Sequence, residues 1–512
     1  MPGRLRATDY DSDFSFERLK GWLRTCDKQH GASCRTRSLL NAPLPTRVLD
    51  VADDCIRLVE PSHQQQKGKY ITLSHRWGGK NVIKTTVATL KARKAGIPAR
   101  DLPQTFADAV TVCRRLDVRY LWIDSLCIIQ DSHEDWEREA ARMANVYANS
   151  YLTIAASSSP DSGGGCFPSW EVRSQKPYLS PEARSIALPF IGDTAPVRYT
   201  VGNRQATSWL AARQYVYINS EWEGRQSSRL IIHGEWMPSS TRRKPKRFYV
   251  GSFGQRLDPV QDETLNSRGW TLQERLLSPR TIHYAADQMY WECERDFLGE
   301  DGSVFDPSIF SLNAVLERQC LPNVEHGFTS HGFVSGIEGF STRMERPRGR
   351  WRGGWLDHIQ AYSGRHLTYA EDKLPALAGL ATLITARTGD EYLAGLWRAH
   401  ILEDLCWRTY EAEETWEDLE EAESDYWGYA FARPGGMKPV RRADKKLRKA
   451  HVAMPSRAPS WSWANLDGCV RFVPLDFTRI RTAFVSCKIE AEGPNSFSRV
   501  REGRMVLSVS RA

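Results

Sequence analysis

Long hydrophobic runs are missing from this chain of 512 residues. No stretch approaches the ~20 consecutive apolar residues that a membrane-spanning helix needs, and the start, MPGRLRATDYDSDF, lacks the apolar segment of a signal peptide. The 11 cysteines are scattered without paired spacing, which is not the pattern of a disulfide framework. We therefore expect reduced thiols, no membrane contact and a cytosolic or nuclear protein, with the cytoplasm as the predicted location.

The common catalytic signatures are missing as well. The chain has no G-x-x-x-x-G-K-[ST] phosphate loop, no G-x-G-x-x-G, no H-E-x-x-H and no G-x-S-x-G. These absences argue against a kinase, a dehydrogenase, a zinc protease and a serine hydrolase.

One spacing is typical of metal ligands, because Cys26, His30 and Cys34 recur at every fourth residue. A closed zinc site takes four ligands, and no clear fourth ligand lies nearby in the sequence. An ordinary N-terminal loop is the simpler interpretation, so no metal is predicted.

The net charge of +8 is modest for this length. We read the basic runs at 242–247 and 438–449 as paired or solvated loops, so nucleic acid is not expected as a partner.

The segment from 70 to 156 alternates between strand and helix patterns. Short apolar runs at 70–74, 119–124 and 151–156 predict buried strands, and apolar residues at helical spacing predict helices over 104–116 and 133–148. This order is typical of right-handed parallel crossovers in an α/β domain. The first two runs end in polar and aromatic residues. Because ligands of open α/β sheets bind at the carboxyl edge, a site is expected there.

The rest of the chain changes character twice. The segment 168–260 reads as an irregular or β-rich insertion, followed by a helix over 268–277 and a hairpin over 281–293. Helices are predicted over 355–407 and a β-rich tail from 459. We expect an N-terminal segment (1–60), a central domain (61–300) and a mixed α+β C-terminal region (301–512).

Long blocks of this sequence resemble the fungal heterokaryon incompatibility (HET) domain. The blocks follow the family's order from 70 to about 295: LSHRWG at 73–78, LPQTFADAV at 102–110, RYLWIDSLCIIQ at 119–130, EDWEREAARMANVYANSYLTIAA at 134–156 and NSRGWTLQERLLSPR at 266–280. The chain departs from the family pattern at His75-Arg76, commonly Tyr-Cys, and at Ile129, often Asp. APSWSWANLDG at 458–468 is among later blocks that resemble a segment often accompanying this domain.

The HET family is thought to be a distant relative of TIR domains, and the run from Tyr70 to Arg76 is similar to the first strand of a TIR domain. This resemblance implies a TIR-like parallel sheet flanked by helices. In NAD-cleaving TIR domains a catalytic Glu follows a Trp in a helix, and Trp136 and Glu139 are similarly placed, one residue closer together than usual. A carboxylate suits this chemistry because cleavage of the nicotinamide–ribose bond develops positive charge on the ribose. A solvated Glu139 paired with Arg142 is the structural alternative.

Further candidates follow from the same blocks. The expected substrate-binding residues are Ser74, Arg76, Trp77, Gly78, Asp124, Cys127, Gln130 and Trp136. The expected motif residues from the later block are Arg268, Gly269, Trp270, Gln273 and Glu274. Each has a structural alternative: packing for the tryptophans, a hydrogen bond for Asp124, a buried thiol for Cys127, and helix capping or ion pairing for the later block.

The resemblance implies a fungal protein of non-self recognition and innate immunity that induces growth arrest or programmed cell death. NAD glycohydrolysis with Glu139 as the catalytic residue is the expected mechanism, with NAD as a possible substrate and no cofactor. The alternative is a non-enzymatic signalling module that acts by self-association, for which the many Trp and Tyr residues offer contact anchors. The sequence does not identify a recognition partner.

Overall fold

The computed structural model describes residues 7, 9–31, 34, 36–61, 66–78, 82–168, 258–300, 302, 304–305, 350–409, 451–452, 457–472, 482–492, 497 and 499–509, together with the backbone of six strands between 186 and 250. The basic run at 438–449 lies outside these residues. Residues 169–257 also lie outside them, apart from the six strands.

A nine-stranded sheet forms the centre of the molecule, in the order β15-β14-β13-β12-β5-β3-β4-β1-β2. Its strands are β1 (Val48–Asp50), β2 (Arg57–Val59), β3 (Tyr70–Ser74), β4 (Tyr120–Ile123), β5 (Leu152–Ala155), β12 (Arg280–Tyr284), β13 (Met289–Cys293), β14 (Phe297–Gly299) and β15 (Val304–Phe305). The predicted strands and hairpin are present, and the α/β class is confirmed. The sheet is parallel only in its middle, where β4, β3, β5 and β12 are neighbours, and antiparallel strands extend both sides.

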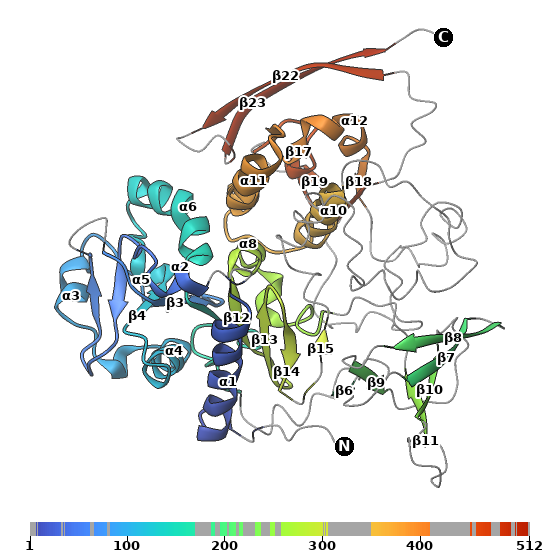
Figure 1. The fold of residues 1–512 in the computed structure, drawn as a ribbon. Helices are drawn as coiled ribbons and strands as arrows, with labels where there is room; N and C mark the ends of the chain where they lie inside the picture. The colour runs from blue at the N-terminus through green and yellow to red at the C-terminus, as the bar shows by residue number, and fades with distance from the viewer. Residues whose placement is uncertain are drawn as a thin grey trace.

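The four parallel strands follow a doubly wound order. When the parallel strands are numbered in chain order (β3, β4, β5, β12), their order across the sheet is 2-1-3-4, which is the flavodoxin-like order. The connections from β3 to β4 and from β4 to β5 therefore run in opposite directions across the sheet. Because such crossovers are right-handed, α4 (Gln104–Arg115) and α6 (His133–Ala148) cover opposite faces (Figure 1). The strand order reverses between β3 and β5, which marks the place where ligands bind in this class.

The helices begin and end for local reasons. Ser132 accepts a hydrogen bond from the backbone N–H of Asp135 and caps α6. Asp124 starts the short helix α5 (Asp124–Cys127) and does not continue the strand. Cys26 lies in α1 (Asp13–Gln29), which packs on β13, so the expected N-terminal loop is wrong at this position. Two further helices, α2 (Thr36–Leu40) and α3 (Leu90–Ala95), precede α4.

A second, antiparallel sheet lies in the predicted insertion, which confirms its β-rich character. Its order is β6-β9-β11-β10-β7-β8, and Figure 1 shows it apart from the central sheet. The strands are β6 (Ile186–Pro189), β7 (Ala195–Val201), β8 (Arg204–Leu210), β9 (Tyr215–Ile218), β10 (Ile231–Trp236) and β11 (Lys246–Val250).

The C-terminal region mixes helices and hairpins. Its elements are α10 (Arg350–Ser363), α11 (Pro375–Thr388), β16 (Tyr392–Leu393), β17 (Leu396–Trp397), α12 (Ile401–Asp404), β18 (Trp407–Thr409), β19 (His451–Val452), β20 (Leu466–Asp467), β21 (Val470–Phe472), β22 (Thr482–Glu492) and β23 (Arg499–Val509). The β-rich tail is confirmed. The all-helical expectation for 355–407 is wrong at β16 and β17, where Ala394 and Gly395 adopt positive φ and make a tight hairpin turn. Short 3₁₀ helices occupy Ala99–Asp101, Thr264–Ser267, Ala370–Lys373, Arg398–His400 and Trp463–Asn465.

Helix α8 (Thr271–Leu277) joins the central sheet to the C-terminal region. It contacts both α6 and α11, and all of its residues are buried. The helix begins later than the predicted 268 because the residues before it bond to another segment: the N–H of Gly269 donates to the carbonyl of His366 at 2.7 Å, and the N–H of His366 donates to that of Ser267 at 2.6 Å.

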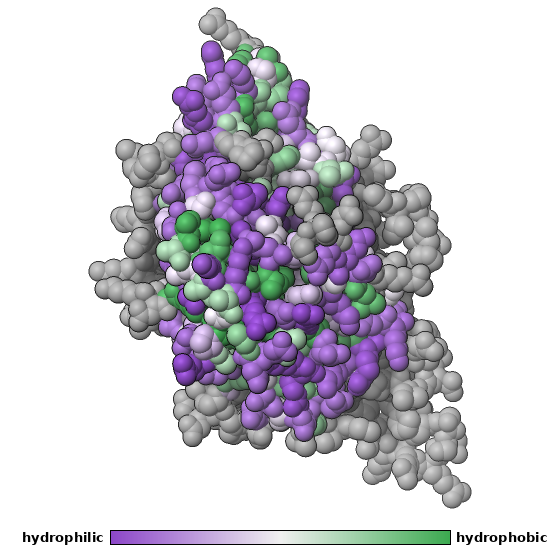
Figure 2. Space-filling model, turned by 90° about the vertical axis from the view of Figure 1, so that its left-hand side faces the viewer, coloured by the Kyte–Doolittle hydropathy of each residue, from purple (hydrophilic) through white to green (hydrophobic). Residues whose placement is uncertain are grey.

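Hydrophilic side chains predominate on the face shown in Figure 2, with small apolar patches between them. The described helices include none with the length and apolar composition needed to cross a membrane. Apolar side chains also appear at the top of this view, where Figure 1 places the hairpin β22–β23.

Two helix glycines allow a test of the packing around α8. A Cβ on Gly379 of α11 would overlap the Cβ of Ala144 and lie 2.7 Å from Oε1 of Gln273, whereas a Cβ on Gly21 of α1 would meet nothing within 4 Å. Gly379→Ala should lower the free energy of unfolding by about 1–3 kcal/mol through overpacking. Gly21→Ala should raise it by about 0.5–1 kcal/mol through helix propensity. Denaturant unfolding of both variants measures the contrast, and a stabilising Gly379→Ala would contradict the packing.

Candidate functional site

The parallel strands end beside a small pocket at the switch point. Its lining residues come from strands β3, β5 and β12, the 3₁₀ turn before α8 and α8 itself: Ser74, Thr153, Ala155, Leu265, Asn266, Thr271, Arg275, Thr281 and His283. The free space is about that of one water molecule. The pocket therefore lies between one face of the sheet and α8, and Ser74 at the end of β3 connects it to the carboxyl edge, at which this fold class binds ligands.

Asp124 is the centre of the polar groups at this edge. Its two carboxylate oxygens accept hydrogen bonds from Nε1 of Trp77 at 2.9 and 2.8 Å. Oδ1 also accepts from the N–H of Ser125 at 2.7 Å, and Oδ2 lies 3.1 Å from Nη2 of Arg268. Asp124 is 5% exposed, so these donors replace most of the water around its carboxylate. Segments following β3, starting α5 and preceding α8 meet at this one side chain.

Arg268 also fixes the backbone of the loop after β3. Its Nη1 donates to the carbonyl oxygen of His75 at 2.5 Å, and its guanidinium lies 5.6 Å from the ring of Trp77. The His75 ring is fully buried against Phe106, with ring centroids 4.9 Å apart. Burial lowers the pKa of His75 to about 4, so the imidazole is neutral at pH 7.

Glu274 contributes a second buried carboxyl group to the same edge. It accepts a hydrogen bond from the hydroxyl of Ser74, which lines the pocket. Burial raises the pKa of Glu274 to about 7 and the charge of Asp124 acts in the same direction, whereas Arg268 and the hydrogen bonds from Ser74 and Tyr147 oppose the shift. A carboxyl group that titrates near neutrality can exist in both protonation states at physiological pH, which is the property of a general acid or base.

Gly78 holds the loop after β3 against the loop after β5. Its φ is +79°, and a Cβ there would overlap the side chain of Asp161. The hydroxyl of Ser162 donates to the carbonyl of Trp77 at 3.0 Å. Only glycine satisfies both the left-handed backbone and the close approach. Arg76 is half-buried in this loop.

The other expected substrate-binding residues have structural contacts. Cys127 is buried, and burial raises the pKa of its thiol to about 12, which suits an inert thiol. The amide of Gln130 donates to the carbonyls of Asp124 and Ile128, both at 3.1 Å. The ring of Trp136 lies 5.1 Å from the guanidinium of Arg499, in β23.

Glu139 is buried on α6 and pairs with arginines of the same helix. Its Oε1 lies 3.4 Å from Nε of Arg138 and 3.8 Å from Nη1 of Arg142. The Arg142 pair of the structural alternative is present, but Glu139 is only 2% exposed, so the expectation of a solvated side chain is wrong. Among the hydrogen bonds and ion pairs of the described residues, none joins Glu139 to Asp124, Arg268 or Glu274.

The motif from 268 to 274 faces two ways. Arg268 and Glu274 point toward the strand ends, whereas the remaining motif residues contact the C-terminal region. The indole of Trp270 donates to Asp372 at 3.2 Å, and Oε1 of Gln273 accepts from the N–H of Gly379 at 2.9 Å. A Cβ on Gly269 would overlap the side chain of Leu367.

A buried ionic network beside the pocket was not predicted. Arg275 pairs with Asp258 and Glu292, each at 2.8 Å, and Nε2 of His283 lies 2.7 Å from Glu292. Burial opposes ionisation of Glu292, but the charge of Arg275 and the hydrogen bond with His283 outweigh it and lower its pKa to about 2. The sequence spacing of these residues does not predict the network, because they come from α8 and three other segments.

The fold and the site define an α/β protein of the doubly wound class with a carboxyl-edge site. The family model described as Heterokaryon incompatibility protein (HET) matches residues 70–274. Residues 70–274 therefore form a HET domain, as the sequence blocks predict. The match starts with β3 and ends at Glu274, so the fourth parallel strand, β12, follows it. No curated protein and no solved structure matches the chain significantly.

The raised pKa of Glu274 predicts a pH-dependent stability. An ordinary glutamate has a pKa of 4.5, and folding raises that of Glu274 to about 7. The folded state thus holds this proton more tightly than the unfolded state. Protonation of Glu274 contributes fully to the free energy of unfolding below pH ~4.5, and this contribution is lost as the pH rises through about 7. Between pH 5 and 8, the wild type should lose roughly 2 kcal/mol of unfolding free energy relative to Glu274→Gln. Urea unfolding at both pH values measures this, and a pH-independent difference would contradict it.

Proposed function

We propose that this protein acts in fungal non-self recognition and induces growth arrest or programmed cell death by cleaving NAD at the carboxyl edge of β3 and β5. The HET domain supports the incompatibility role. The observation that carries the enzymatic part is Glu274, a buried carboxyl group with a pKa of about 7 that is hydrogen-bonded to pocket residue Ser74.

The reaction needs a carboxylate and a water molecule. The bond between C1′ of the ribose and the nicotinamide nitrogen breaks, and its electron pair leaves with nicotinamide. Positive charge develops on the ribose, which an ionised Glu274 would stabilise. Water then adds to C1′ and releases a proton, giving ADP-ribose. Since ionisation of Glu274 is half complete near pH 7, activity should rise from pH 6 to pH 8.

Glu139 is the carboxylate that the TIR resemblance suggests, and the contacts of the described residues favour Glu274 over it. Glu139 lies beside two arginines of its own helix. Glu274 lies beside the pocket and within the influence of Asp124 and Arg268. Both carboxylates are therefore tested side by side.

The pocket must widen for this function. Free space for about one water molecule does not admit a dinucleotide. Binding of NAD therefore requires α8 or the loop after β3 to move away from the strand ends. Because α8 also packs on α11, we propose that the C-terminal region controls this opening.

The test is induced expression of matched variants in a fungal host, with protein level, NAD and growth followed together. Glu274→Gln preserves the shape of the side chain and should abolish an NAD loss that precedes arrest in the wild type. Glu137→Gln, a partly exposed position on α6, is the control and should behave like the wild type. Nicotinamide release by the purified full-length chain at pH 6 and pH 8 gives the direct rate.

Glu139→Gln decides between the two carboxylates. If it removes NAD loss while Glu274→Gln keeps it, the assignment to Glu274 is wrong and the TIR-based assignment gains support. Arrest with unchanged NAD in the wild type would exclude glycohydrolysis as the mechanism.

One observation favours self-association as the second candidate. The long hairpin β22–β23 pairs with no other strand among the described residues. Val485, Val506 and Val509 on it are 54%, 40% and 71% exposed. Exposed apolar ribbons with free edges are typical assembly surfaces. Concentration-dependent assembly of a chain that arrests growth without consuming NAD would support this function.

A further inference from the structure

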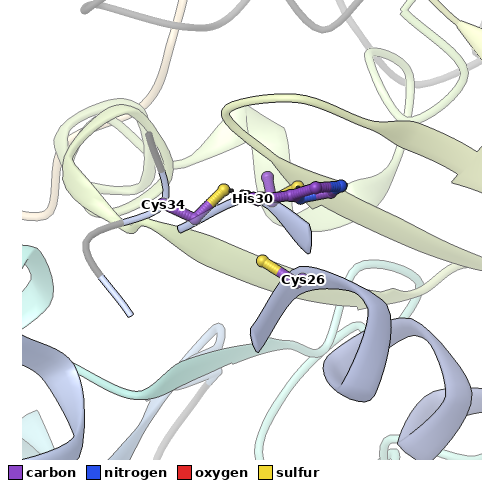
Figure 3. A group of neighbouring side chains, drawn as sticks. Cys26, His30 and Cys34 are labelled. Atoms are coloured by element: carbon purple, nitrogen blue, oxygen red, sulfur yellow. Dashed lines mark hydrogen bonds between the residues drawn. The ribbon is translucent and has the colours of Figure 1, made fainter. Parts of the chain in front are cut away.

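Four potential metal ligands converge at the end of the sheet opposite the candidate site. Cys26 and His30 end helix α1, Cys34 follows shortly after, and Cys293 is the last residue of β13. Figure 3 shows the side chains of Cys26, His30 and Cys34 turned toward one another. The cluster lies at the amino end of β12, because Cys293 pairs with Arg280 in the strand register.

The ligand spacing fits tetrahedral coordination. Nδ1 of His30 lies 3.6 Å from the sulfur of Cys34 and 3.6 Å from that of Cys293. All four ligand atoms lie within 4.8 Å of one another. A tetrahedral zinc ion with Zn–S of about 2.3 Å and Zn–N of about 2.0–2.1 Å separates sulfur from nitrogen by about 3.6 Å.

Groups around the cluster are placed as outer partners of a metal site. Nε2 of His30 lies 3.3 Å from Oδ2 of Asp296, which leaves Nδ1 facing the sulfurs. A carboxylate on the outer nitrogen is the usual way to orient a ligating histidine. The N–H of Asp296 points at the sulfur of Cys293 at 3.4 Å, a hydrogen bond that favours a thiolate.

We propose that Cys26, His30, Cys34 and Cys293 bind one structural zinc ion. Three thiolates and one imidazole are a donor set that selects zinc, and four protein ligands leave no open position for catalysis. The three cysteines are at most 5% exposed, so the site is closed. A disulfide between any two of them would use two sulfurs and leave the third sulfur and the histidine unexplained.

The zinc ion would fasten the N-terminal helix to the central sheet. Without it, α1 is held on β13 by contacts such as the stacked rings of Trp22 and Trp291, 6.4 Å apart. The ligands bracket the matched HET segment, since three precede residue 70 and one follows residue 274. The site thus ties the N-terminal segment to β13 of the central sheet.

Metal analysis of the full-length chain tests the proposal. The protein is purified under reducing conditions from zinc-supplemented cells, without chelators, and its zinc, iron and copper are measured by plasma mass spectrometry. The wild type should carry about one zinc per chain. Cys293→Ala should lose at least ~80% of that zinc, since a three-ligand site is open and weaker. Cys113→Ala, which removes a buried thiol outside the cluster, should keep it.

A second measurement on the wild type does not depend on the variant folding. Stepwise titration with a mercurial reagent, in the presence of a chromogenic zinc chelator, should release zinc as the clustered thiols react. Alkylation of the denatured, unreduced chain should label all three cysteines. A wild type without zinc, a different metal in its place, a disulfide within the cluster, or a Cys293→Ala variant with undiminished zinc would each overturn the proposal.

Discussion

The ion pair between Asp124 and Arg268 is the interaction on which the carboxyl edge depends. It joins the start of α5 to the segment before α8, residues that are 144 positions apart. A buried carboxylate is stable only where donors replace its water, and Trp77, Ser125 and Arg268 supply them. Because Arg268 also holds the carbonyl of His75, the pair sets the shape of the loop beside the pocket. The pKa of Glu274 is raised by burial, and the same two charges modulate it in opposite directions, since Arg268 lowers it and Asp124 raises it.

The same short motif connects this edge to the C-terminal region. Arg268 and Glu274 face the strand ends, while Trp270 and Gln273 bond to Asp372 and Gly379. A displacement of α11 would therefore act on α8, and through α8 on the pocket. This arrangement gives a physical route by which an event in the C-terminal region reaches the site. The C-terminal region thus contacts the HET domain through Trp270 and Gln273 of the 268–274 motif.

The helices and strands could be predicted well from the sequence, because the periodic spacing of apolar residues and the capping residues are local signals. Ser132 caps α6, and the buried run Tyr70–Ser74 forms a central parallel strand. It did not predict which side chains meet. The bond between Ser74 and Glu274 spans 200 residues, and His30 and Cys293 are 263 positions apart. No spacing rule covers such separations in sequence, so Cys293 could not be predicted as the fourth ligand of the proposed metal site. Glu139 is expected at the site from a resemblance, whereas its observed pair with Arg142 follows from helical spacing.

The most direct test of the central pair is a double-mutant cycle on Asp124→Asn and Arg268→Gln, with unfolding free energies measured in denaturant. The account predicts a coupling of about 2–3 kcal/mol, since each single change leaves a poorly solvated partner. The more exposed pair Asp50–Arg119, at 2.7 Å, is the matched reference and should couple by less than about 1 kcal/mol. A coupling between Asp124 and Arg268 no larger than that reference would contradict the claim that this pair organises the site.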